Sequence, residues 1–104
     1  MSKARVLVVE DEAIVAMETA KSLQNLGYEV ISTVNSGDVA IKKAEDEKPD
    51  IILMDIHIQG DKDGIETAEI IRNKYGIPVI YTTAYSDDER IERAKQTIPF
   101  GYII

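Results

Sequence analysis

Cysteine and tryptophan are absent from this chain of 104 residues, which also contains only one histidine and three prolines. Without cysteine there can be no disulfide framework and no thiolate metal site. No apolar run approaches the ~20 residues that span a bilayer. The N-terminus leads straight into an apolar segment at Val6–Val9, without the pattern of a signal peptide. Together these absences favour a cytoplasmic protein.

Positive charge is also scarce, because 12 Lys and Arg face 19 Asp and Glu and leave a net charge of −7. Binding to a phosphate backbone depends on Lys and Arg, so this segment is not expected to bind nucleic acid directly. An anionic membrane surface is an equally poor partner. The length suits one domain, and 44% of the residues are apolar, as in an ordinary globular protein.

Five short apolar segments alternate with segments of helical periodicity. The predicted strands are Arg5–Val9, Tyr28–Val34, Ile51–Met54, Pro78–Thr83 and Pro99–Ile104. Strands that alternate with helices predict a parallel sheet, with right-handed crossovers and helices on both faces. The second strand is more polar than the others and is therefore expected near an edge of the sheet.

Local signals mark the helices between these strands. Ser36 is a predicted N-cap with Asp38 in the first helical turn, and a capping-box pattern at 86–89 predicts a further helix that continues to Ile98. Gly27 and Gly76 are predicted to end the first and third helices. The apolar stripe of the first helix is predicted to comprise Ala13, Ala16, Met17, Ala20 and Leu23.

Acidic and hydroxyl side chains stand where the predicted strands end. Glu10 and Asp11 follow the first strand, Asp55 follows the third, and Thr83 and Ala84 close the fourth. Ligands of open parallel sheets bind beyond the carboxyl ends of the strands. We therefore expect three carboxylates from two strands to converge there with a hydroxyl group.

Carboxylates held close together repel one another and raise one another's proton affinity, a conflict that a bound cation resolves. All-oxygen ligands select a hard cation, and few protein ligands with room for water favour Mg²⁺. The same ion can place a phosphoryl group beside a carboxylate nucleophile, which is a known route to an aspartyl phosphate. Thr83 is placed to donate a hydrogen bond to a phosphoryl oxygen.

Along its whole length the sequence resembles the receiver domains of response regulators, which belong to two-component signalling systems. The likeness is carried by five segments, namely 6–12 with its acidic pair, 49–56 around Asp55, 63–66, 78–84 with Thr83-Ala84, and 101–104. This resemblance implies a flavodoxin-like α/β fold, a doubly wound parallel five-stranded sheet in the order 2-1-3-4-5. The same resemblance makes 1–104 a receiver domain.

The resemblance also implies a role for each matching residue. Asp55 would be the phosphoacceptor, and Asp11, Glu10 and Asp55 would bind Mg²⁺ together with the backbone carbonyl of His57. Thr83 and Ala84 would bind the phosphoryl group. Thr83 would also act in the conformational switch, together with the ring of Tyr102. Glu10 stands where the family most often has Asp, and Gln59 stands where a Pro is usual.

In the family, a phosphate-binding Lys followed by Pro comes directly after the position of Ile104, and a fifth helix follows. The segment 1–104 is therefore expected to be a C-terminally incomplete receiver domain that lacks the fifth helix. The apolar face that this helix would cover favours self-association.

Three functional hypotheses follow. The first is a phosphorylatable receiver whose partner is a sensor histidine kinase or a phosphotransfer domain, and whose parent could itself be a histidine kinase with an N-terminal receiver. The second is an aspartate-nucleophile phosphatase, which is disfavoured because His57 stands where that class has a second Asp. The third is a receiver-like interaction module that never takes phosphate. The first is preferred, so the chain is not expected to be an enzyme.

Overall fold

The computed structural model describes residues 3–58, 60–82 and 102–103, the last two by their backbone only. In chain order the elements are β1 (Arg5–Val9), α1 (Ala13–Asn25), β2 (Glu29–Val34), α2 (Gly37–Glu47), β3 (Ile51–Asp55), α3 (Gly64–Tyr75), β4 (Val79–Thr82) and β5 (Tyr102–Ile103). The predicted alternation of strands and helices is confirmed over this part of the chain.

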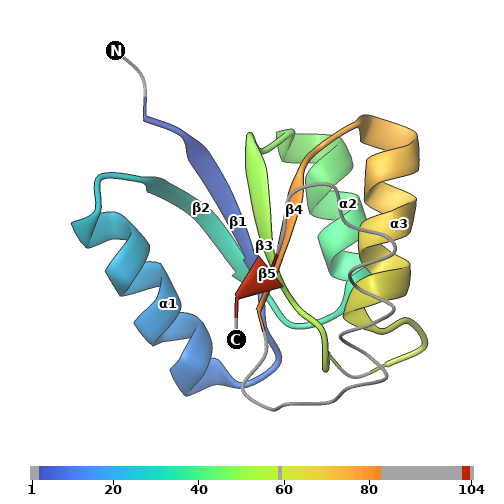
Figure 1. The fold of residues 1–104 in the computed structure, drawn as a ribbon, viewed down its shortest axis with the longest axis horizontal. Helices are drawn as coiled ribbons and strands as arrows, with labels where there is room; N and C mark the ends of the chain where they lie inside the picture. Colours follow the sequence, from blue (N-terminus) through green and yellow to red (C-terminus); the bar gives the residue numbers. More distant parts are fainter. Residues whose placement is uncertain (1–2, 59, 83–101, 104) are drawn as a thin grey trace.

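The strands form one parallel sheet in the order β2-β1-β3-β4-β5, as the resemblance implied. α1 covers one face of the sheet, while α2 and α3 lie side by side on the other (Figure 1). This is the flavodoxin-like arrangement, with the more polar β2 at one edge. Because every strand runs in the same direction, the carboxyl ends of β1, β3 and β4 meet at the lower edge of the sheet in Figure 1.

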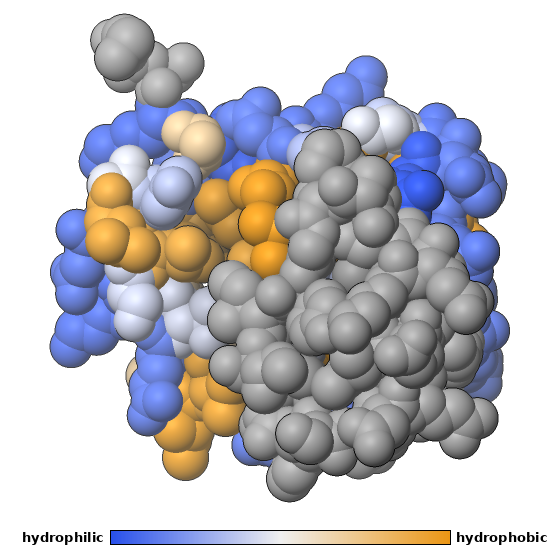
Figure 2. Space-filling model, viewed as in Figure 1, coloured by the Kyte–Doolittle hydropathy of each residue, from blue (hydrophilic) through white to orange (hydrophobic). Residues whose placement is uncertain are grey.

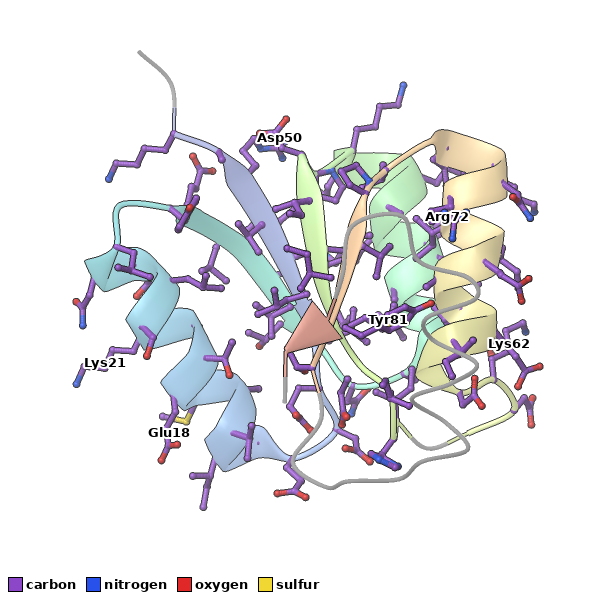
Figure 3. The ribbon with its side chains drawn as sticks, viewed as in Figure 1. Glu18, Lys21, Asp50, Lys62, Arg72 and Tyr81 are labelled. Atoms are coloured by element: carbon purple, nitrogen blue, oxygen red, sulfur yellow. The ribbon has the colours of Figure 1, made fainter. Side chains whose placement is uncertain are left out.

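The main core lies between the sheet and the pair α2–α3. Ile52 and Met54 of β3 and Tyr81 of β4 are fully buried there, together with Ile71 of α3. Tyr81 points from β4 toward the two helices (Figure 3). Tyr81 is fully buried in this core, whereas Tyr75 packs against the core while remaining partly exposed.

The predicted apolar stripe of α1 was partly wrong. Ala16 is buried, and Ala20 and Leu23 are half-buried, but Ala13 is exposed and Met17 is 71% exposed. The face toward the sheet is rotated to include the half-buried residues Val15 and Thr19. Both stripes share the positions 16, 20 and 23, and hydrophobicity alone favours Met17 over Thr19. Figure 2 shows hydrophobic surface on the left of the molecule, the side on which α1 lies in Figure 1.

The predicted helix ends are confirmed where the structure describes them. Ser36 is the N-cap of α2 and accepts a hydrogen bond from the backbone N–H of Val39 at 3.4 Å. Gly76 ends α3 with φ of 66°, a left-handed conformation that glycine adopts without steric cost. The helix predicted over 86–98, with Thr83 and Ala84 before it, lies outside the described residues.

Adjacent isoleucines of α3 offer a test of this packing. Ile71→Ala should lower the free energy of unfolding by about 2–5 kcal/mol, because Ile71 is fully buried between α3 and the sheet. Ile70→Ala removes the same atoms from a half-buried position and should cost clearly less. Urea unfolding measures both values, and equal losses would contradict the placement of α3.

Candidate magnesium and phosphoacceptor site

The site begins with the register of the two central strands. β1 and β3 pair in parallel, and Val9 lies opposite Met54. Glu10 follows Val9 and Asp55 follows Met54, so these two acids become neighbours at the carboxyl edge of the sheet. Asp11 follows directly in the loop before α1. Parallel pairing therefore brings Glu10 beside Asp55, which lies 45 positions later in the sequence.

The predicted convergence of three carboxylates is confirmed by the geometry. One oxygen each from Glu10, Asp11 and Asp55 lies within 4.8 Å of the other two, and this is the one such group of potential metal ligands in the described part of the chain. Asp55 is only 6% exposed, whereas Glu10 and Asp11 are half-buried. The cluster thus has a buried acid at its base and two more accessible acids above it.

Backbone hydrogen bonds hold these side chains in place. The N–H of His57 donates to Oδ1 of Asp55 at 3.0 Å, and the N–H of Glu12 donates to Oε2 of Glu10 at 3.0 Å. The N–H of Ile56 donates to the carbonyl oxygen of Thr82 at 3.1 Å, which ties the chain after Asp55 to β4. Asp55, the candidate phosphoacceptor, is therefore held in place by hydrogen bonds on the residues that follow it.

The electrostatics of the cluster show the cost of this crowding. Burial raises the pKa of the Glu10 carboxyl to about 7, although the hydrogen bond from Glu12 N–H opposes the rise. Hydrogen bonding and charge repulsion from Asp55 and hydrogen bonding with Asp11 raise this pKa further. With a pKa of about 7, the carboxyl of Glu10 is only partly ionised at neutral pH.

The donor set fits a magnesium ion. Carboxylate oxygens are hard ligands, three of them lie close enough to share one cation, and two of the three acids are accessible from solvent. A groove of about 500 Å³ between α1, β2 and α2 opens beside Glu10 and Asp11. A cation in contact with these oxygens would remove the repulsion that raises the pKa of Glu10.

The start of α3 forms the floor of the site, a contact that sequence reasoning missed. The N–H of Gly64 donates to the carbonyl oxygen of Ile56 at 3.1 Å. Asp63 caps the helix in a capping box with Glu66. The Asp-x-x-Glu pattern at 63–66 was a sequence signal for this cap. No local signal marks its approach to β3.

A surface ion pair also ties the loop before α3 to α2. The Nζ of Lys62 lies 3.0 Å from Oδ1 of Asp38, and both side chains are at the surface. Figure 3 shows Lys62 at the base of α3. The hydrogen bond and charge of Asp38 raise the pKa of Lys62, so the lysine stays charged at neutral pH.

The remaining predicted site residues lie largely outside the part of the chain that the structure describes. Thr83 and Ala84 lie outside the described residues, as does the side chain of Tyr102. Tyr102 belongs to β5, and its backbone pairs with that of Tyr81 in β4. His57 contributes the N–H that binds Asp55, while the metal-binding role of its carbonyl stays a prediction.

Known proteins resemble the chain over almost its full length. The response regulator receiver domain family matches residues 6–104. The transcriptional regulatory protein PdtaR of Mycobacterium tuberculosis is 36% identical over 100 residues, covering 96% of this chain and 48% of that protein. The alkaline phosphatase synthesis transcriptional regulatory protein PhoP of Bacillus subtilis is 38% identical over 85 residues, covering 81% of this chain and 35% of PhoP.

A solved structure supports the same relationship. The signal receiver domain of a modulated diguanylate cyclase from Desulfovibrio desulfuricans superposes with a TM-score of 0.90 and 39% identity, covering 97% of this chain and 80% of that one. The chain spans about half or less of the length of the two curated relatives. Among the described residues, none of the helices has the length and apolar character needed to cross a bilayer.

The raised pKa of Glu10 predicts a pH dependence. Its pKa is about 7 in the folded protein and near 4.5 in the unfolded chain, so the folded state binds the proton more tightly. Stability should therefore fall as pH rises from about 4.5 to 7, and Mg²⁺ should offset the fall. Carbon-detected NMR of the Glu10 carboxyl should show the titration, and Asp55→Asn should move its midpoint downward. A midpoint that stays put in Asp55→Asn would contradict the proposed coupling.

Proposed function

The chain belongs to the response regulator receiver domain family of two-component phosphorelay signalling, and on that premise we propose that Asp55 accepts a phosphoryl group with the help of Mg²⁺. The observation that carries this proposal is the position of Asp55. Its carboxylate is 6% exposed and lies at the base of the only cluster of three acidic ligands in the described structure. A burial this deep is costly for a carboxylate that has no chemical task.

The proposed donor is the phosphohistidine of a sensor histidine kinase or a phosphotransfer domain. A carboxylate oxygen of Asp55 attacks phosphorus, and a new P–O bond forms as the P–N bond to the imidazole breaks. The electron pair of that bond remains on the imidazole nitrogen, which then takes up a proton. The product is an aspartyl phosphate on Asp55, a mixed anhydride that water can hydrolyse later.

Transfer needs positive charge where three phosphoryl oxygens approach an acidic cluster. Glu10, Asp11, Asp55 and the backbone carbonyl of His57 would hold Mg²⁺, which supplies charge neutralisation to the incoming group. The N–H of His57 already binds one oxygen of Asp55, which leaves the other oxygen to act as the nucleophile. Thr83 and Ala84 are proposed to contact the phosphoryl oxygens.

Phosphorylation is proposed to switch the conformation of the domain and thereby control an output. Thr83 and Tyr102 are the proposed switch residues, and the backbone of Tyr102 lies beside Tyr81 of β4. The output resides in the parent protein or in a partner. Relatives of this chain include transcriptional regulatory proteins and a protein-glutamate methylesterase, so the receiver itself is compatible with several outputs.

The receiver-like module that never takes phosphate is the competing hypothesis. Such a module requires neither metal ligands nor a nucleophile. The cluster at the edge of the sheet retains candidates for both roles, which favours the phosphorylatable receiver. A receiver at the N-terminus of a sensor histidine kinase would use the same chemistry. Receiver domains act as signalling domains and not as enzymes with turnover, so the proposed reaction is a single phosphorylation of the protein itself.

A small phosphodonor such as acetyl phosphate tests the nucleophile. With Mg²⁺ present, intact-mass spectrometry should show one added phosphoryl group, and Asp55→Asn should abolish it because the amide is not a nucleophile. Asp61→Asn removes the same charge from an exposed loop position and should leave the labelling unchanged. Equal labelling of Asp55→Asn and the wild type would rule out Asp55 as the phosphoacceptor.

Isothermal titration calorimetry tests the metal ligands. Asp11→Asn should weaken Mg²⁺ binding by about tenfold or more, since loss of even an outer-shell partner costs about 10–100-fold. Glu12→Gln removes the same charge from the next position, which is exposed and outside the cluster, and should change the affinity little. An Asp11→Asn variant that binds Mg²⁺ as tightly as Glu12→Gln would remove Asp11 from the site.

A further inference from the structure

Gly64 is the first residue of α3 and is buried against the backbone of the phosphoacceptor. A Cβ atom at this position would overlap the carbonyl oxygen of Asp55, and it would lie 2.9 Å from both the carbonyl carbon of Asp55 and the Cα of Ile56. The N–H of Gly64 also donates to the carbonyl oxygen of Ile56 at 3.1 Å. The helix thus touches the backbone of the residue that carries the chemistry.

Space, and not backbone conformation, explains a glycine here. The glycines with positive φ in the described structure are Gly27, Gly60 and Gly76, and Gly64 is not among them. Alanine would therefore suit the backbone of position 64, and it forms helices more readily than glycine. The obstacle is the approach of Asp55 and Ile56, which are backbone atoms that cannot turn aside as the end of a side chain can.

The start of α3 is held on its other side, so it cannot simply retreat. The first turn moves as one unit, because Asp63 accepts a hydrogen bond from the N–H of Glu66 at 2.9 Å and the hydroxyl of Thr67 donates to the carbonyl oxygen of Asp63 at 2.8 Å. Thr67 is fully buried against α2, and Lys62 pairs with Asp38 of the same helix. A side chain at position 64 would therefore push on the segment 55–56.

From this packing we infer that Gly64 is a positioning residue for phosphoryl transfer, because its missing side chain sets the distance between the Asp55 carboxylate and the two acids that follow β1. This inference rests on the proposed function of Asp55. Glu10 and Asp11 follow β1, whereas Asp55 ends β3. A displacement of Asp55 alone therefore changes the geometry of the ion site. A misplacement of ~1 Å can slow a reaction by ~100-fold.

The test compares Gly64→Ala with Gly37→Ala. Gly37 is also buried and also begins a helix, but a Cβ there would overlap the side-chain oxygen of Thr67, and its nearest neighbours include no atom of Asp55. Both variants are overpacked, and only one presses on the phosphoacceptor. The rate of Asp55 labelling by acetyl phosphate and the Mg²⁺ affinity are measured at a temperature where circular dichroism shows both variants folded.

Gly64→Ala should slow labelling by about tenfold or more and weaken Mg²⁺ binding by several-fold, since both depend on where Asp55 lies. Gly37→Ala should affect both clearly less than Gly64→Ala, even if it melts lower, because its Cβ meets a side-chain oxygen of Thr67 and no atom of Asp55 or Ile56. Equal behaviour of the two variants would overturn the inference. A wild type that neither binds Mg²⁺ nor takes phosphate would instead refute the proposed function itself.

If Gly64→Ala does not fold, the inference can be tested on the wild-type protein. Amide NMR spectra are recorded during a Mg²⁺ titration. The signal of Gly64 should shift with the same midpoint as that of His57, because their amides bind the carbonyl of Ile56 and the carboxylate of Asp55. The signal of Gly37 should stay in place. A Gly64 signal as unresponsive as that of Gly37 would overturn the inference.

Discussion

Repulsion among three carboxylates at one edge of a parallel sheet is the constraint on which this site depends. The sheet imposes it, because parallel pairing of β1 and β3 brings Glu10 beside Asp55. Water cannot relieve it fully, since Asp55 is almost completely buried. The pKa of Glu10 is raised first by burial and then by hydrogen bonding and charge repulsion from Asp55. A divalent cation resolves the repulsion and at the same time supplies the charge that a phosphoryl group needs.

The backbone around the cluster makes the conflict persistent. A free carboxylate would turn toward solvent, but the N–H of His57 binds Asp55, and the N–H of Glu12 binds Glu10. Ile56 is tied to β4, and Gly64 abuts the same segment from α3. The proposed chemistry therefore draws on neighbouring strands and one helix, which explains why a receiver needs its whole fold to hold a few acids.

Most of the fold and the centre of the site could be predicted from the sequence, because both follow from local patterns. Apolar runs such as Arg5–Val9 end in acids, and those ends must meet in a parallel sheet. The rotation of α1 could not be predicted. Met17 is more hydrophobic than Thr19 and was therefore expected to face the sheet, but packing against the sheet places Thr19 there instead. The close approach of Gly64 to Asp55 depends on how α3 packs against the end of β3, and it leaves no local pattern in the sequence.

Anomalous diffraction from crystals containing Mn²⁺ can locate the cation, because Mn²⁺ accepts the same oxygen ligands as Mg²⁺ and scatters anomalously. The account predicts one strong peak among the carboxylates of Glu10, Asp11 and Asp55, which is lost in crystals of Asp11→Asn. A peak elsewhere, or no peak at this edge of the sheet at millimolar Mn²⁺, would contradict it.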